Sequence, residues 1–287
     1  MRLSDIHMRD PFVVPVASEG LYYLFGSTDA DIWGSTSGVG FNCFTSRDLE
    51  NWEGPIPAFR PPTDFWSQGE FWAPECHAYR GDYYLFATFN GSTRWRGTQI
   101  LRSTSGRPEG PYAVMGPYPV TPADWGCLDG TLFVDDANCP WMIFCHEWSQ
   151  IKIGTIEAMP LKDDLSEAAG PPVTLFHANA PSWARDLVEH PGCWVTDGPY
   201  LYHEDGRLFM LWSGFSESGY TMGLAESESG GPLGPWRQHE TPIYTADGGH
   251  GMRFLTFDGQ PMVAVHTPNA TPQERPIFFP APARLTR

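Results

Sequence analysis

Five ionisable residues recur at matched positions in the chain, each shortly before a turn that leads into an apolar segment. Asp10, Asp129, Asp197 and His250 stand nine or ten residues before their turns, and Glu75 stands six before its own. Carboxylic acids that share an enclosed site repel one another and lose water, so at least one of them keeps its proton more tightly. A protonated acid beside an ionised carboxylate is what combined general acid and general base catalysis requires.

Hydrolysis of a glycosidic bond uses such a pair. One carboxylic acid protonates the leaving oxygen, and one carboxylate activates water or attacks the sugar directly. Tryptophans near the same strands fit this chemistry, because an indole face packs on the apolar C–H face of a sugar ring. Trp72 and Trp148 are therefore candidate sugar contacts, as is Trp194. The alternative for each is packing in a β-sheet core, which is the commoner use of an aromatic residue.

Two further charged residues are candidates for substrate contact. Glu75 can accept hydrogen bonds from sugar hydroxyls, and Arg253 can donate to a hydroxyl or offset the charge of the acids. The alternative for Glu75 is a carboxylate tied into a backbone turn beside Pro74. His146 can line the pocket beside Trp148 or be a core residue with one hydrogen bond.

The elements that position these residues repeat five times. Each is a turn followed by a short apolar strand, at 20–25, 81–86, 138–144, 206–212 and 259–265, with turns 53 to 68 residues apart. The 30 glycines and 28 prolines are scattered evenly, which is typical of many short strands joined by turns. The pattern favours an all-β fold of five four-stranded modules arranged radially, with the first strand of each lining a central channel. The ionisable residues on those strands are expected to converge.

Length and composition limit the other classes of function. The 287 residues are predicted to form one domain, 1–287, because the repeats run through the whole chain. A net charge of −16 argues against nucleic acid or an anionic membrane as partner. No segment has the apolar length of a signal peptide core or a membrane span, so a cytoplasmic location is expected. The six cysteines lack metal-binding spacing and are expected to be free thiols.

The motifs around the ionisable residues resemble those of glycoside hydrolase family 43. They read Arg-Asp-Pro-Phe at 9–12, Trp-Ala-Pro-Glu at 72–75, Leu-Asp-Gly at 128–130, Thr-Asp-Gly-Pro at 196–199 and Gly-His-Gly at 249–251. The resemblance covers almost the full chain and implies a five-bladed β-propeller. It also implies an inverting hydrolase that acts on arabinose- or xylose-containing fragments of plant polysaccharides.

The resemblance assigns a role to each motif residue. Asp10 is the general base that deprotonates water, Asp129 raises the pKa of the acid and holds it in place, and Asp197 is the general acid. His250 matches a channel histidine that helps to hold a metal, often calcium, at the centre of the propeller. His250 could equally be a structural histidine, and the role of His266, which matches another family histidine, stays unassigned.

Asp197 departs from the family pattern, which has glutamate at this place. Aspartate is one methylene shorter, and a displacement of about 1 Å can cost a catalytic group on the order of a hundredfold in rate. A shift of the backbone can compensate, since inverting enzymes tolerate a range of carboxyl separations. Glu189, close upstream, is the replacement candidate, with an exposed loop residue as its alternative.

The sequence therefore predicts an exo-acting hydrolase that releases terminal α-L-arabinofuranosyl residues from arabino-oligosaccharides. A β-D-xylosidase acting on xylo-oligosaccharides is the second candidate, because the family holds both activities. A propeller that binds sugar without cleaving it follows if Asp197 does not reach the leaving oxygen. A protein-binding scaffold is disfavoured, since it has no use for several desolvated carboxylates in one channel.

Overall fold

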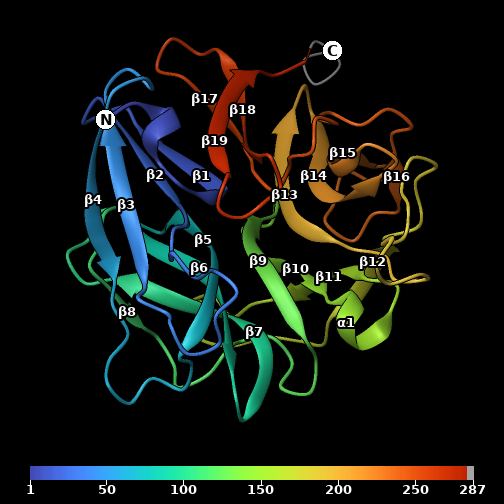
Figure 1. Ribbon diagram of the computed structural model, residues 1–287, viewed down its shortest axis with the longest axis horizontal. Coiled ribbons are helices and arrows are strands. Elements are labelled where there is room, and N and C mark those ends of the chain that lie inside the picture. The colour runs from blue at the N-terminus through green and yellow to red at the C-terminus, as the bar shows by residue number, and fades with distance from the viewer. Residues whose placement is uncertain (283–287) are drawn as a thin grey trace.

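The computed structural model describes residues 1–282, and in this part of the chain nineteen strands form five antiparallel sheets around a common axis (Figure 1). The first sheet contains β1 (Arg9–Val16), β2 (Leu21–Ser27), β3 (Phe41–Ser46) and β4 (Trp52–Phe59). The second contains β5 (Gly69–Tyr79), β6 (Asp82–Gly91), β7 (Arg94–Ser103) and β8 (Tyr112–Val114). The third contains β9 (Cys127–Val134), β10 (Pro140–His146), β11 (Thr155–Pro160) and β12 (Val173–His177).

The last two sheets complete the ring. The fourth contains β13 (Asp197–Glu204), β14 (Arg207–Ser216), β15 (Gly219–Ser227) and β16 (Trp236–Gln238). The fifth has three strands, β17 (Arg253–Leu255), β18 (Pro261–Thr267) and β19 (Arg275–Pro280). The two short helices are η1 (Leu3–Asp5) and α1 (Trp148–Ile151), and no helix in residues 1–282 is long and apolar enough to cross a membrane. The predicted five-bladed β-propeller is confirmed; residues 283–287 of the predicted domain lie outside the described range.

The N-terminal segment joins the fifth blade to the first. The helix η1 packs against β19, and Arg275 Nε donates to the Ser4 carbonyl at 3.1 Å. On the other side Arg2 forms a β-bridge with Asn51, and the Trp52 N–H donates to the Met1 carbonyl at 2.9 Å. The two ends of the chain therefore hold the ring together where no continuous strand crosses it.

The apolar runs that mark the five repeats are the second strands of the blades. Each second strand lies inside its own sheet and is covered on both faces by side chains, so it has no polar side. Its central residues are completely buried, as shown by Leu24, Phe86, Phe144, Leu211 and Val263. Burial of a side chain of this size contributes about 1.5–3 kcal/mol to the free energy of unfolding. This burial fixes the blades against one another and so fixes the first strands at the axis.

The backbone breaks regular β-structure at one equivalent place in every blade, at or just before the first strand. A residue there has positive φ: Asp10 (55°), Ala73 (46°), Asp129 (57°), Gly198 (52°) and His250 (41°). In the first four blades the pairing of the first strand with the second shifts register at this place, which is the mark of a β-bulge. Bulges re-aim side chains, and here they turn the start of each inner strand toward the axis.

This register corrects the expected set of equivalent positions. In the second blade the equivalent residue is Ala73, and Glu75 lies two residues further along β5. In the fourth blade it is Gly198, and Asp197 lies one residue before it. Ionisable side chains therefore occupy the equivalent position in only three blades, and Asp197 approaches the axis from the neighbouring position.

Candidate active site

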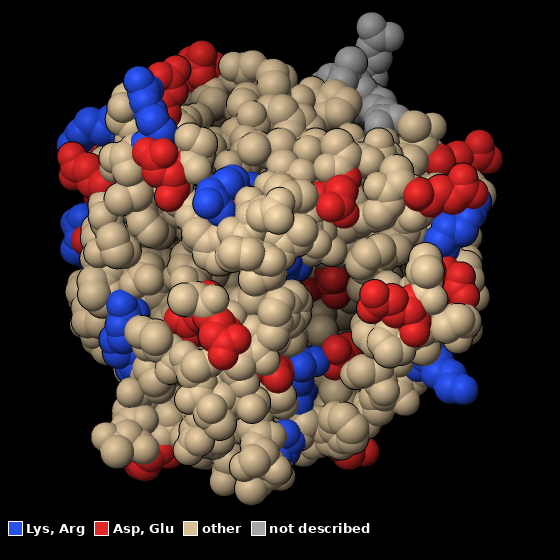
Figure 2. Space-filling model, viewed as in Figure 1, with Lys and Arg blue, Asp and Glu red and all other residues tan. Residues whose placement is uncertain are grey.

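A cavity of about 410 Å³ opens at the end of the propeller axis. Figure 2 shows the hollow near the middle of this face, with acidic side chains at its base. Six of the residues predicted from the sequence line it, namely Asp10, Trp72, Asp129, Trp148, Asp197 and His250, whereas Trp194 and His146 do not. Its volume is within the usual range of small-molecule sites. The residues brought together come from all five blades, which explains why no short motif contains the site.

The two charged residues predicted to contact substrate do not line the cavity either. Glu75 is buried and pairs with His77, whose Nε2 lies 2.9 Å from Glu75 Oε2. Arg253 pairs with Glu204 and lies over the ring of Tyr202, 5.1 Å from its centroid. The structure therefore does not bring Glu75 and Arg253 to the cavity, and each side chain has a partner at another place in the propeller.

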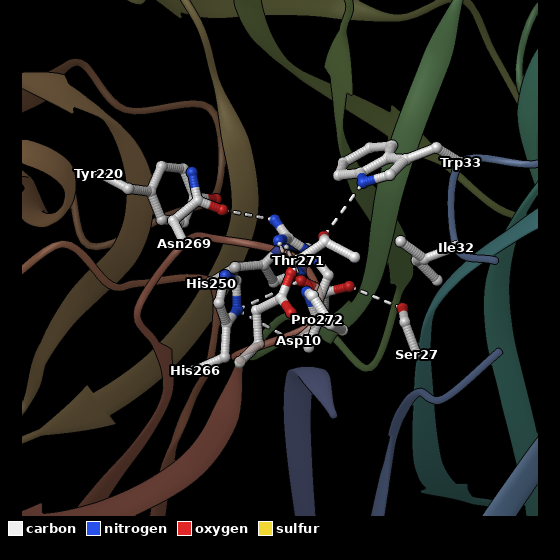
Figure 3. A network of polar contacts seen from close by, with 12 residues as sticks. Asp10, Ser27, Ile32, Trp33, Tyr220, His250, His266, Asn269, Thr271 and Pro272 are labelled. Carbon is white, nitrogen blue, oxygen red and sulfur yellow. Dashed lines mark hydrogen bonds and ion pairs between the residues drawn. The ribbon is translucent and has the colours of Figure 1, made fainter. Parts of the chain in front are cut away.

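Asp10 is held in an ionised state at the base of the cavity. Its Oδ2 accepts a hydrogen bond from Ser27 Oγ at 2.6 Å, and its Oδ1 lies 3.2 Å from His250 Nδ1 (Figure 3). Burial alone raises the pKa of Asp10, but His250, the guanidinium of Arg9 and the Ser27 hydrogen bond outweigh it and lower the pKa below its ordinary value. The group is therefore a carboxylate with one oxygen facing the imidazole, suited to accept a proton from water.

Asp129 has the opposite character. Burial is the main reason that its pKa lies well above the ordinary value, and the charge of Asp10 adds to the effect. Its Oδ2 accepts a hydrogen bond from the Gly198 N–H at 3.0 Å and lies 3.5 Å from His250 Nδ1. Asp129 therefore contacts the backbone directly after Asp197 and shares an imidazole with Asp10.

Asp197 holds its proton to a higher pH than an ordinary aspartic acid, because its pKa is raised. Burial first, and then the nearby Asp129, raise the pKa of Asp197 to about 7, although His250 and a hydrogen bond from Tyr220 act in the other direction. Tyr220 OH donates to Asp197 Oδ2 at 2.9 Å. Glu189, the alternative acid, is exposed and does not line the cavity. The cavity thus contains a carboxylate at Asp10 and a proton-holding carboxyl at Asp197.

In each of the five residues with positive φ at the breaks in the blades, the backbone N–H donates a hydrogen bond to a side chain. Four of the acceptors belong to the second strand of the preceding blade, and the fifth, Asp129, belongs to a first strand. The acceptors are His266 Nδ1 for Asp10, Ser27 Oγ for Ala73, Thr88 Oγ1 for Asp129, Asp129 Oδ2 for Gly198 and Ser213 Oγ for His250, at 2.8–3.1 Å. These bonds hold the strained backbone and thereby the direction of each catalytic side chain.

His266 has a clear structural task. It is completely buried, and burial, with the charge of Arg9, lowers the pKa of His266 to about 3, so the ring is neutral. Its Nδ1 is unprotonated and accepts the Asp10 N–H at 3.1 Å. His266 therefore fixes the main chain of Asp10 and does not act as a cation beside it.

The donor set at His250 does not make a calcium site by itself. Calcium takes about six to eight oxygen ligands, whereas among residues 1–282 no three His, Cys, Asp or Glu side chains are arranged to hold a metal. His250 Nδ1 is directed at Asp10 and Asp129. Calcium at the propeller centre stays a prediction.

An aromatic wall closes one side of the cavity. Trp72 donates its indole N–H to the Ile32 carbonyl at 2.6 Å, and Trp33 packs edge-on against it with ring centroids 5.3 Å apart. Trp33 is 55% exposed; its indole N–H donates to Thr271 Oγ1 at 3.1 Å and its ring lies under the guanidinium of Arg9. Two indoles at a fixed angle offer apolar faces for a sugar ring.

Several residues of the cavity were not predicted. Trp33, Asn269 and Thr271 lie on loops, and Tyr220 lies on β15. Glu147, another lining residue, pairs with Arg96 at 2.6 Å. Glu147 could most easily have been found from the sequence, because it directly precedes Trp148, which was predicted to contact the sugar. For Trp33 the only signal was the Gly- and Ser-rich stretch 29–40, whose path the sequence does not define.

Replacement of Gly198 by alanine is expected to lower the free energy of unfolding by roughly 2–5 kcal/mol and to impair activity. The residue has φ +52°, and a Cβ would lie 2.5 Å from His250 Cδ2, so both the backbone and the imidazole would be strained. Gly206→Ala is the matched control, with φ +73° and open space around the Cβ. Urea denaturation measures both variants; an equal loss in the two would show that contact with His250 is unimportant.

Comparison with known proteins places this geometry in context. The family model for glycosyl hydrolases family 43 matches residues 4–278. The crystal structure of an endo-arabinase from Bacteroides thetaiotaomicron is 36% identical with a TM-score of 0.89, over 98% of this chain and 96% of that one. A beta-D-galactofuranosidase of Aspergillus niger is 24% identical over 85% of this chain and 69% of its own length. Alpha-L-arabinofuranosidase 43 of Humicola insolens is 25% identical over 69% of this chain and 42% of its own length, so the chain spans less than half of that enzyme.

Proposed function

This chain belongs to glycosyl hydrolases family 43 and is a glycoside hydrolase, and we propose that it releases terminal α-L-arabinofuranosyl residues from arabino-oligosaccharides with inversion. The observation that carries the proposal is the division of charge between two carboxyl groups in one cavity. Asp10 has its pKa below the ordinary value, whereas burial and Asp129 raise that of Asp197 to about 7. A base and an acid therefore coexist at the pH of catalysis.

The roles follow from these contacts. Asp10 Oδ1 takes a proton from the water that attacks the anomeric carbon, while Ser27 and His250 hold the carboxylate in place. Asp197 gives its proton to the glycosidic oxygen as the bond to the leaving sugar breaks. Asp129 raises the pKa of Asp197 and binds the adjacent Gly198 N–H at 3.0 Å. A water between sugar and base yields a product of inverted configuration.

Arabinose is the proposed sugar because arabinan-active proteins recur among the relatives. The Bacteroides thetaiotaomicron endo-arabinase supports it most strongly, at 36% identity over nearly the whole chain. An extracellular exo-alpha-(1->5)-L-arabinofuranosidase of Cellvibrio japonicus is 28% identical over half of this chain. Xylose is the second candidate, supported by an endo-1,4-beta-xylanase of Bacteroides thetaiotaomicron at 25% identity and a TM-score of 0.73.

The experiment that tests the proposal uses two kinds of substrate. The 4-nitrophenyl α-L-arabinofuranoside and β-D-xyloside identify the sugar by release of 4-nitrophenol. Linear arabino-oligosaccharides, analysed by chromatography during the first turnovers, distinguish the mode of attack: arabinose alone indicates exo action, and early di- and trisaccharides indicate endo action. Activity on xylosides alone would overturn the assignment of arabinose as the sugar released. Sugar binding without turnover would favour the non-hydrolytic alternative. A parallel series with a chelator and added calcium tests the predicted metal.

The pH dependence of kcat/KM is expected to be bell-shaped, with its alkaline limb near pH 7. Asp197 must be protonated, so activity is present below its pKa of about 7 and falls tenfold per unit above it. Asp10 must be ionised, and because its pKa is lowered, activity is lost only in strongly acidic solution. Initial rates on an arabino-oligosaccharide from pH 3 to 9 measure the alkaline limb and test whether activity is retained in mildly acidic solution. An alkaline limb unchanged in Asp197→Asn would contradict the assignment.

A further inference from the structure

Tyr220 reaches the cavity from an unexpected direction. It lies on β15, the third strand of the fourth blade, whereas the aspartates lie on first strands. The residue is 1% exposed, yet it lines the cavity and its hydroxyl donates to Asp197 Oδ2 at 2.9 Å. Figure 3 shows its ring beside Asn269 near the Asp10 network. The chemistry proposed above assigns it no task.

The main chain of Tyr220 is fixed on both sides. Its N–H donates to Asp247 Oδ1 at 3.2 Å, and its carbonyl accepts the Gly248 N–H at 2.9 Å. At Gly249 a Cβ would lie 3.0 Å from Tyr220 Cε1, so glycine there leaves room for the ring. The segment 247–249, which precedes His250, therefore sets the place of the tyrosine.

The ring of Tyr220 is also held by aromatic neighbours. It stacks on His266 with centroids 5.6 Å apart and planes 23° apart, and it contacts Phe215 at 5.4 Å. A tyrosine has only two side-chain torsions that place its hydroxyl, apart from the rotation of the O–H itself. With the ring packed on both neighbours, the oxygen is a preorganised donor aimed at one oxygen of Asp197.

The hydrogen bond makes the two oxygens of Asp197 unequal. Oδ2 accepts the Tyr220 hydroxyl, whereas Oδ1 accepts no hydrogen bond from the side chains or backbone of residues 1–282. The oxygen without a partner is the one able to carry the proton into the cavity. A short side chain gains most from such a contact, because aspartate has less reach than glutamate to correct its own position.

We propose that Tyr220 is a positioning residue for general acid catalysis, which holds Asp197 by Oδ2 and leaves Oδ1 to donate the proton to the glycosidic oxygen. The proposal rests on the role of Asp197 as the acid in the proposed function. The proton passes from Asp197 Oδ1 to the leaving oxygen as the glycosidic bond breaks, and Tyr220 keeps its own proton throughout. Donation to the carboxylate also stabilises the ionised form, so Tyr220 opposes the effects of burial and Asp129 on the pKa of Asp197.

The test is Tyr220→Phe, which removes one oxygen and keeps the ring. On an arabino-oligosaccharide, kcat is expected to fall by about 10- to 100-fold, the usual worth of a hydrogen bond to a charged group. On the 4-nitrophenyl glycoside the fall is expected to be much smaller, because that leaving group needs little protonation. The alkaline limb of the kcat profile is expected to move up by about one unit or more, since the ionised acid loses a donor.

Tyr202→Phe is the matched control. Tyr202 is on β13 of the same blade, is buried, and its hydroxyl has no hydrogen-bond partner within residues 1–282. It does not line the cavity, so its variant is expected to retain both the wild-type rate and the wild-type pH limb. If Tyr220→Phe lowers the rate on both substrates equally and leaves the alkaline limb in place, the tyrosine is merely structural and the proposal is wrong.

A double-mutant cycle separates this proposal from the proposed function. With Asp197→Asn in place, Tyr220→Phe is expected to cause no further loss, because both changes affect one proton transfer. Additive losses would overturn the positioning role while leaving Asp197 as the acid. If the wild-type protein cleaves none of the glycosides, or if Asp197→Asn cleaves oligosaccharides at the wild-type rate, the proposed function itself has failed.

Discussion

Replacement of Asp10 by asparagine is expected to lower kcat/KM on arabinofuranosyl substrates by about 10²- to 10⁴-fold, the range of general base catalysis. The amide has nearly the shape of the carboxylate and can still accept the Ser27 hydrogen bond of 2.6 Å. It cannot take a proton from water. The loss is expected on 4-nitrophenyl glycosides as well as on oligosaccharides, because activation of water is needed whatever the leaving group. Initial rates on both substrates measure it.

Asp29→Asn is the control for the removal of a buried carboxylate. Asp29 is 6% exposed, accepts the Val39 N–H at 3.0 Å and does not line the cavity. Its variant is expected to retain activity, whereas thermal melting shows whether either protein has lost its fold. An Asp10→Asn protein that is folded and retains wild-type activity would exclude Asp10 as the base. The water would then have to be activated by another group in the cavity.

The fold could be predicted largely because it repeats. Each repeat has an apolar second strand buried on both faces, and this pattern is visible in the sequence as a turn followed by four or more apolar residues. The same turns located Asp10, Asp129 and His250, which stand at the equivalent positive-φ position of their blades. Closure of the ring was not predictable, because the bridge between Arg2 and Asn51 depends on where the finished blades meet.

Glu75 and Arg253 lie away from the cavity for different physical reasons. Counting residues back from a turn assumes a regular strand, but β5 shifts register twice, between Gly69 and Trp72 and again between Trp72 and Glu75. Each bulge adds a residue that the count does not detect. Arg253 follows a segment with positive φ at His250, and its charge is satisfied by Glu204 of the fourth blade. Glu204 is 49 residues from Arg253 in sequence, whereas His77, the partner of Glu75, is only two residues away.

The repeat of turns and apolar strands could not predict the site residues that lie on third strands and loops. Tyr220 is on β15, and nothing in the sequence of that strand indicates that its hydroxyl binds Asp197 of β13. Trp33 and Thr271 meet across 238 residues of sequence. Contacts of this kind are set by how blades and loops pack in three dimensions. The sequence thus indicated the catalytic carboxyl groups but not the groups that orient them or shape the cavity.

Replacement of Asp197 by asparagine is expected to reduce activity in a way that depends on the leaving group. On arabino-oligosaccharides the fall in kcat/KM is expected to be about 10²- to 10⁴-fold, because an alkoxide leaves poorly without a proton. On the 4-nitrophenyl arabinofuranoside most of the activity is expected to remain, since nitrophenolate is stable. The alkaline limb near pH 7 is expected to disappear from the residual hydrolysis of arabino-oligosaccharides, because the group that titrates there has been removed.

Glu189→Gln is the matched control, since Glu189 is the exposed alternative acid and lies outside the cavity. It is expected to behave as the wild type on both substrates. If Asp197→Asn retains oligosaccharide hydrolysis, the proton must come from another carboxyl group. Glu147 would then be the next residue to replace, because it lines the same cavity. Its carboxylate pairs with Arg96 at 2.6 Å.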